Sequence, residues 1–159
     1  MIARIEKVDN NYLAIYERNL SHPVEEVWSY LTDNEKLQKW FSELRVVELR
    51  EGGVIKFDMG DGTFDELTIL DLKLNSVLEF SWWIDTVRFE LSPETGGSSL
   101  VLIEKIHTIT EHTPRDLAGW HVCLDVIEAL LDDRSIERKE EWKFWYEKYV
   151  KEIEKVTQQ

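Results

Sequence analysis

Apolar and polar residues alternate through residues 44–107, and this period of two is the feature that most constrains the fold. Residues two apart lie on the same face of a β-strand, so the alternation predicts strands with one buried face. Breaks at 52–53, 60–62, 75–76 and 93–97 contain the Gly, Asn, Asp and Pro residues typical of tight turns. The predicted strands are 45–50, 54–59, 64–74, 77–83, 87–92 and 98–107.

The segments before this meander predict one strand and two short helices. Residues 12–20 are rich in β-prone residues and form the strand, whereas the first eleven residues are a polar start with no predicted element. Pro23 suits a first helical turn, and Asp33 can cap a second helix that ends near Phe41.

Two longer helices are predicted after the meander. The first runs from Pro114 to Leu131 and has a stripe of apolar residues at helical spacing. The stripe consists of Leu117, Trp120, Leu124, Ile127 and Leu131. The final helix, 135–156, carries Trp142, Trp145, Tyr149, Ile153 and Val156 along one side. Two interpretations are open for it: packing onto its own domain, or forming a homodimer or gating a cavity.

The order of these elements predicts a single domain over residues 1–159. Meandering antiparallel strands with grouped helices are typical of the α+β class, here a curved antiparallel sheet with a long helix against it. No repeat, linker or low-complexity run divides the chain.

Charge and cysteine content restrict the partners. The formal net charge is −13, which repels phosphate backbones and anionic membranes, so we expect no nucleic-acid partner. No segment reaches the roughly 18 apolar residues of a membrane span, and the first residues lack the apolar core of a signal peptide. Cys123 is the only cysteine, which fits a buried thiol in a reducing compartment. We therefore expect a cytoplasmic protein without membrane insertion.

Several segments together resemble a known family. VEEVWSYLTDNEKLQKWF resembles the entry motif of the START-like (SRPBCC, helix-grip) superfamily, and more narrowly its bacterial branch related to the C-terminal domain of the 90-kDa heat-shock-protein ATPase activator. VLEFSWW, RFELSPETGGSSLVLIEK, DLAGWHVCLDVIEALL and the tail WKFWYEKYV follow in the order of that branch. The resemblance implies a sheet that grips a long helix, with a cavity between them for a small hydrophobic or amphipathic molecule. It implies no fixed catalytic set.

The alternation in the strands and the apolar stripe of the helix predict which side chains point into the space between sheet and helix, where such a cavity would lie. Each of these residues also fits plain core packing. The candidate ligand-binding residues are Phe57, Phe80, Trp82, Phe89, Leu102, Glu104, Gly119, Trp120, His121 and Leu124.

Glu104 and Gly119 are the most informative of these candidates. Glu104 shares its strand face with Leu102 and Ile106, so its carboxylate should point inward, where it needs a partner or stays protonated. Alternatively, a β-bulge or the end of the strand would turn this carboxylate to solvent, or a salt bridge within the protein would occupy it. Gly119 lies inside a helix, where glycine costs about 1 kcal/mol relative to alanine. Two reasons would explain a glycine at this position: the helix approaches the sheet closely there, or the missing side chain leaves room for a ligand.

The remaining polar residues predict no metal and no cofactor. His107, His112, His121 and Cys123 are spread over a strand end, a loop and a helix, which does not match zinc-ligand spacing. We expect His121 at the cavity rim. No phosphate loop, dinucleotide motif or nucleophile elbow occurs.

These observations favour a binding module over an enzyme. The first hypothesis is binding of a small hydrophobic molecule, for sensing, carriage or storage, without conventional catalysis. One alternative is a cyclase- or dehydratase-like enzyme that uses the same cavity, and the other is a co-chaperone-like interaction module.

Overall fold

The computed structural model describes residues 1–158, and this part of the chain forms eight strands and four helices. In chain order they are β1 (Arg4–Val8), β2 (Asn11–Leu20), α1 (Val24–Thr32), α2 (Asn34–Trp40), β3 (Leu44–Val46), β4 (Val54–Asp58), β5 (Phe64–Lys73), β6 (Val77–Trp82), β7 (Asp85–Glu94), β8 (Gly97–Ile106), α3 (Thr113–Leu131) and α4 (Arg138–Thr157).

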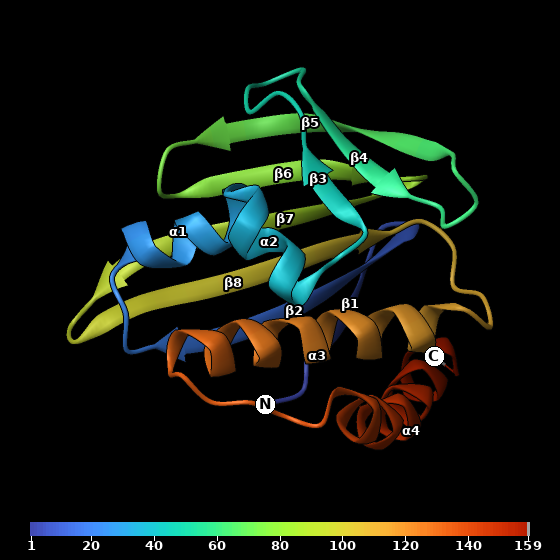
Figure 1. Cartoon of the computed structure of the whole chain (residues 1–159). Helices are drawn as coiled ribbons and strands as arrows, with labels where there is room; N and C mark the ends of the chain where they lie inside the picture. Colours follow the sequence, from blue (N-terminus) through green and yellow to red (C-terminus); the bar gives the residue numbers. More distant parts are fainter. Residues whose placement is uncertain (159) are drawn as a thin grey trace.

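All strands join one antiparallel sheet in the order β1-β2-β8-β7-β6-β5-β4-β3. The early strand β2 pairs with the late strand β8, so that Tyr12 lies opposite Ile106. Figure 1 shows α3 lying along the curved sheet, with α1 and α2 on the same side and α4 outside α3. The α+β helix-grip architecture expected from the sequence is confirmed.

Most predicted helices form where the sequence places them. Asp33 caps α2 through its side chain, which accepts a hydrogen bond from the backbone N–H of Glu35 at 3.1 Å. Pro23 directly precedes α1, and its carbonyl accepts the first backbone hydrogen bonds of that helix. The five stripe residues predicted for α3 are all buried. The periodicity therefore identified the correct face of α3.

Three local predictions are wrong. The first residues are not without structure: Arg4–Val8 form edge strand β1, which the pattern missed because only Ile5 is partly buried. The strand expected over 45–50 ends at Val46. The strand expected over 77–83 ends at Trp82, because the chain turns at Trp83 with φ 56°, and the ring centroids of the two indoles lie 4.9 Å apart.

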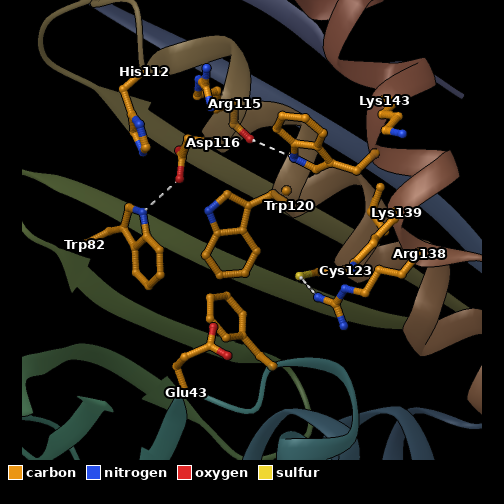
Figure 2. A pocket seen from close by; sticks show the side chains of 14 residues that line it. Glu43, Trp82, His112, Arg115, Asp116, Trp120, Cys123, Arg138, Lys139 and Lys143 are labelled. Atoms are coloured by element: carbon orange, nitrogen blue, oxygen red, sulfur yellow. Dashed lines mark hydrogen bonds between the residues drawn. The ribbon is translucent and has the colours of Figure 1, made fainter. Parts of the chain in front are cut away.

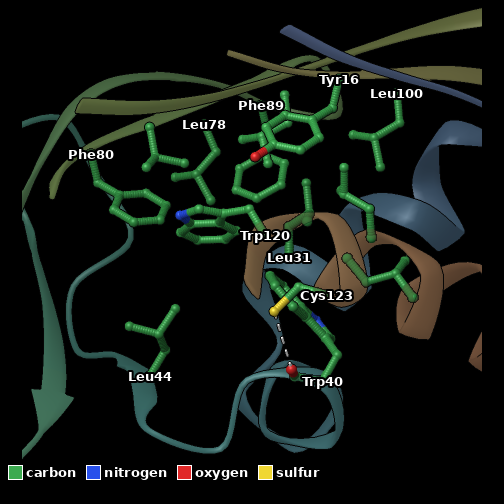
Figure 3. Packing of buried hydrophobic residues seen from close by; sticks show 14 of the residues in the cluster. Tyr16, Leu31, Trp40, Leu44, Leu78, Phe80, Phe89, Leu100, Trp120 and Cys123 are labelled. Carbon is green, nitrogen blue, oxygen red and sulfur yellow. Dashed lines mark hydrogen bonds between the residues drawn. The ribbon is translucent and has the colours of Figure 1, made fainter. Parts of the chain in front are cut away.

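The hydrophobic core lies between the sheet and helices α1 to α3 (Figure 3). Trp40 and Phe89 meet edge to face with ring centroids 6.3 Å apart. The indole N–H of Trp40 donates to the carbonyl of Tyr30 at 2.7 Å, which satisfies its one polar atom. These contacts join the last residue of α2 to α1 and to the middle of β7.

Helix α4 packs on its own domain, against α3 and the edge strand β1. The buried hydroxyl of Tyr149 accepts a hydrogen bond from the backbone N–H of Ala3 at 3.0 Å and lies 2.7 Å from Nδ1 of His121. Because α4 covers the outer side of α3, that helix is buried on both sides. The first of the two interpretations of the final helix is therefore confirmed, and homodimer formation and gating of the cavity stay predictions.

Candidate functional site

A pocket of about 520 Å³ opens where α3, α4, the end of β6 and the segment after α2 meet (Figure 2). This volume lies within the range of small-molecule sites. The residues that line it are Phe41, Glu43, Trp82, His112, Arg115, Asp116, Gly119, Trp120, Val122, Cys123, Arg138, Lys139, Trp142 and Lys143.

Aromatic rings form one wall of the pocket. Trp82 from β6 and Trp120 from α3 lie with ring centroids 5.0 Å apart, and Phe41 lies 5.4 Å from Trp120. Trp142 from α4 adds a fourth ring, and its indole N–H donates to the carbonyl of Arg115 at 3.4 Å. The wall provides a large apolar surface with edge-to-face geometry.

Gly119 of α3 has no side chain that could cover this aromatic wall. A Cβ atom added at Gly119 would meet no heavy atom within 4 Å outside its own helix. Close approach of the helix to the sheet is therefore not the reason for the glycine. Its missing side chain contributes open space to the pocket.

Asp116 separates this pocket from a second one. Its carboxylate accepts a hydrogen bond from the indole N–H of Trp82 at 3.1 Å. The second pocket, about 350 Å³, lies beside β6 and the loop before α3, and it shares Trp82, His112 and Asp116 with the first. The Trp82–Asp116 hydrogen bond thus forms part of the partition between the two spaces.

Glu104 lies in the interior near Asp116. It is fully buried on β8 between Ala14 of β2 and Val87 of β7, and neither carboxylate oxygen has a hydrogen-bond partner among the described residues. Burial raises the pKa of Glu104 well above its ordinary value, and the charges of Asp116 and Asp85 raise it further. The inward orientation predicted from strand parity is confirmed, but Glu104 does not line the larger pocket.

Cys123 contributes a neutral thiol to the pocket. Burial raises its pKa to about 12, although the nearby guanidinium of Arg138 acts in the opposite direction. Nη2 of Arg138 lies 3.2 Å from Sγ of Cys123. A thiol in this state is a poor nucleophile at neutral pH.

His121 faces α4 rather than the pocket. Its ring is fully buried and stacks on Trp145, with centroids 3.8 Å apart. Nε2 lies 3.3 Å from a carboxylate oxygen of Asp125. Burial lowers the pKa of His121, and Asp125 opposes this effect in part. The residue therefore joins α3 to α4 instead of bordering the open space.

Comparison with known proteins places the chain in a family. Residues 21–132, more than half of the chain, match the family model described as "Activator of Hsp90 ATPase homolog 1-like protein". The chain belongs to this family. The resemblance to START-like proteins that the sequence indicated is thereby confirmed.

Solved structures support the fold. A conserved protein of unknown function from Enterococcus faecalis has a TM-score of 0.80 at 23% identity and covers 94% of this chain and 91% of its own. CalU16 from Micromonospora echinospora has a TM-score of 0.70 at 24% identity and covers 95% of each chain. DynU16, from the dynemicin biosynthetic locus, has a TM-score of 0.65 at 20% identity and covers 76% of this chain and 47% of its own. No curated protein matches the sequence.

The predicted ligand-binding residues fall into three groups. Trp82, Gly119 and Trp120 line the larger pocket, and Phe57 lines the second. The others lie in the packed interior: Phe80, Phe89, Leu102, Glu104, His121 and Leu124.

The residues that sequence reasoning missed share one face of α3 and the start of α4. His112, Arg115, Asp116 and Cys123 recur at helical spacing with the predicted Gly119, and all of them line the pocket. This second stripe was a signal in the sequence, but its mixed polarity hides it from a search for apolar periodicity. The contributions from α4 are Arg138, Lys139, Trp142 and Lys143.

Two further observations limit the chemistry of the described chain. Among residues 1–158, no three His, Cys, Asp or Glu side chains come together as a metal site requires. Over the same residues, none of the helices combines the length and apolar character needed to cross a membrane.

Proposed function

We propose that the protein binds a small hydrophobic or amphipathic molecule in the pocket bordered by α3, α4 and β6. The observation that carries this proposal is the open space at Gly119 in front of Trp82 and Trp120. A glycine inside a long helix destabilises the protein, and no packed neighbour accounts for its presence. Aromatic walls with a few polar groups are typical of small-molecule sites.

Fluorescence titration with the neutral probe N-phenyl-naphthylamine tests this proposal. We expect saturable binding with a Kd on the order of micromolar, together with quenching of tryptophan emission, because the probe would lie against Trp82 and Trp120. Gly119→Leu should fill the open space and weaken binding by about tenfold or more, a loss of roughly 1.4 kcal/mol per factor of ten.

Gly119→Ala is the matched control at the same position. Its single methyl group leaves most of the 520 Å³ free, so the affinity for the probe should stay close to that of the parent. No saturable binding by the parent protein, or equal affinity for the parent and Gly119→Leu, would contradict the proposal.

A second candidate function is proton transfer to a substrate held in the same pocket. It is favoured by Asp116, which lines the pocket, and by Glu104 near Asp116, whose pKa burial raises. Turnover of a polyketide-like compound that is lost in Asp116→Asn, while N-phenyl-naphthylamine still binds, would support catalysis over simple binding.

A further inference from the structure

Cations are concentrated at the pocket of a strongly acidic protein. The chain has 32 Asp and Glu against 19 Lys and Arg, yet the pocket is lined by four cationic side chains and only two carboxylates. The cations are Arg115, Arg138, Lys139 and Lys143, and the carboxylates belong to Glu43 and Asp116. The local balance of charge is thus the reverse of that of the whole chain.

The two arginines of the pocket lack the carboxylate partners that most other arginines of the described chain have. Within residues 1–158, Arg115, Arg138 and Lys139 form no salt bridge, and Lys143 has one contact of 3.9 Å with the exposed Glu140. Arg138 is directed to the Cys123 sulfur, and Arg115 lies over the ring of Tyr146. Elsewhere in the fold, carboxylates pair with Arg4, Arg18, Arg50, Arg88 and Arg134.

The charges are also separated in space. Figure 2 shows Arg138, Lys139 and Lys143 together on the α4 side of the pocket, while Asp116 and Arg115 lie towards His112. The Asp116 carboxylate is already occupied by the indole N–H of Trp82. Arg138 and Lys139 are the first two residues of α4 and line the pocket, whereas Glu140 and Glu141 of the same turn are not among its lining residues.

We propose that the molecule bound in this pocket is an amphipathic anion. This inference rests on the proposed binding function and names the chemical class of the ligand. The apolar part of this molecule packs on Trp82 and Trp120. Its carboxylate, sulfonate or phosphate group binds the cations at the start of α4. Charge-assisted hydrogen bonds to arginine and lysine are the usual means of holding such groups.

Two probes with the same apolar ring system separate the contribution of the rings to the affinity from that of the charge. Anilinonaphthalene sulfonate carries an anionic group that N-phenyl-naphthylamine lacks. We expect one molecule of the sulfonate to bind per chain, about tenfold more tightly than the neutral probe at low salt. Raising the ionic strength to about 0.5 M should remove most of this difference, because exposed charges are screened.

Variants in which one lysine is replaced by a neutral residue then show where the sulfonate group binds. Lys139→Gln and Lys143→Gln should each weaken binding of the sulfonate by about two- to fivefold and leave the neutral probe unaffected. Lys151→Gln, an exposed lysine of α4 outside the pocket, is the matched control and should change neither affinity. Melting curves and near-ultraviolet circular dichroism verify that each variant keeps the parent fold.

The outcomes distinguish this inference from the function on which it rests. If neither probe binds, the proposed binding function fails. If the neutral probe binds as tightly as the sulfonate, the binding function stands and the anion inference is overturned. Equal loss of sulfonate affinity in Lys139→Gln and Lys151→Gln would also overturn it, because the effect would then come from net charge and not from the pocket.

Discussion

Replacing Glu104 with glutamine should stabilise the protein at pH 8 and change its stability little at pH 5. Glu104 is buried without a hydrogen-bond partner among residues 1–158, and burial raises its pKa well above the ordinary value. In the unfolded chain the same carboxyl titrates near about 4.3. Above that pH the folded protein therefore retains a proton that the unfolded chain releases.

The sign and the size of the effect follow from this difference. The stability that the raised pKa provides is fully present below the unfolded pKa and is lost as the pH rises towards the folded pKa. Within this window the free energy of unfolding falls by about 1.4 kcal/mol per pH unit. Over the three units from pH 5 to pH 8, the loss attributable to Glu104 is at most about 4 kcal/mol. Glutamine is neutral throughout and resembles the protonated carboxyl in shape, so the variant escapes this loss.

Thermal unfolding of Glu104→Gln and the parent at pH 5, 6, 7 and 8 provides the assay. At roughly 2–4 °C per kcal/mol for a domain of this size, the Tm difference should grow with pH, to at most about 16 °C. Glu66→Gln, at an exposed position of β5, is the control and should follow the parent at every pH. If the Glu104→Gln and parent curves run parallel, Glu104 is paired or solvated in solution and the reasoning is refuted.

Three smaller predictions concern other buried features. Gly119→Ala should raise stability by about 0.5–1 kcal/mol in thermal melts, because the added Cβ meets no neighbour; a lower Tm would mean that the site is already filled. Tyr149→Phe should lower the free energy of unfolding by about 1–3 kcal/mol in urea titrations, because the Ala3 N–H loses its acceptor and His121 its partner. An unchanged urea midpoint would contradict this. Cys123 should react with a disulfide reagent at pH 8 far more slowly in the native than in the unfolded protein, since its pKa is raised to about 12, and equal rates would disprove its burial.

Much of the fold was predictable because burial leaves a periodic trace in the sequence. The α3 stripe and the inward face of β8, including Glu104, were predicted from spacing alone and are buried in the structure. The same reasoning failed at β1, where one partly buried residue leaves no period to detect. The signal that remained was the Asp9-Asn10 turn, in which Asp9 has a positive φ of 56° suited to a tight hairpin.

The pocket was less predictable than the core. Parity correctly directed Phe80, Phe89, Leu102 and Leu124 inward, but it does not distinguish a side chain packed against neighbours from one that borders open space. Both are apolar and both repeat with the same period. Among the predicted ligand-binding residues only Gly119 carried a separate signal, and even there the sequence left two explanations open until the surroundings of its Cα were known.

By itself the sequence determined the family, the order of the elements and the faces that they bury, because each depends on residues close together in the chain. Tertiary structure decided where the open space lies, since a cavity is the volume left after distant elements have packed. Here α4 covers the side of α3 that carries His121 and places Arg138, Lys139 and Lys143 beside the aromatic wall. The periodicity of α3 or of α4 does not predict that arrangement, because it arises only from the contact between the two helices.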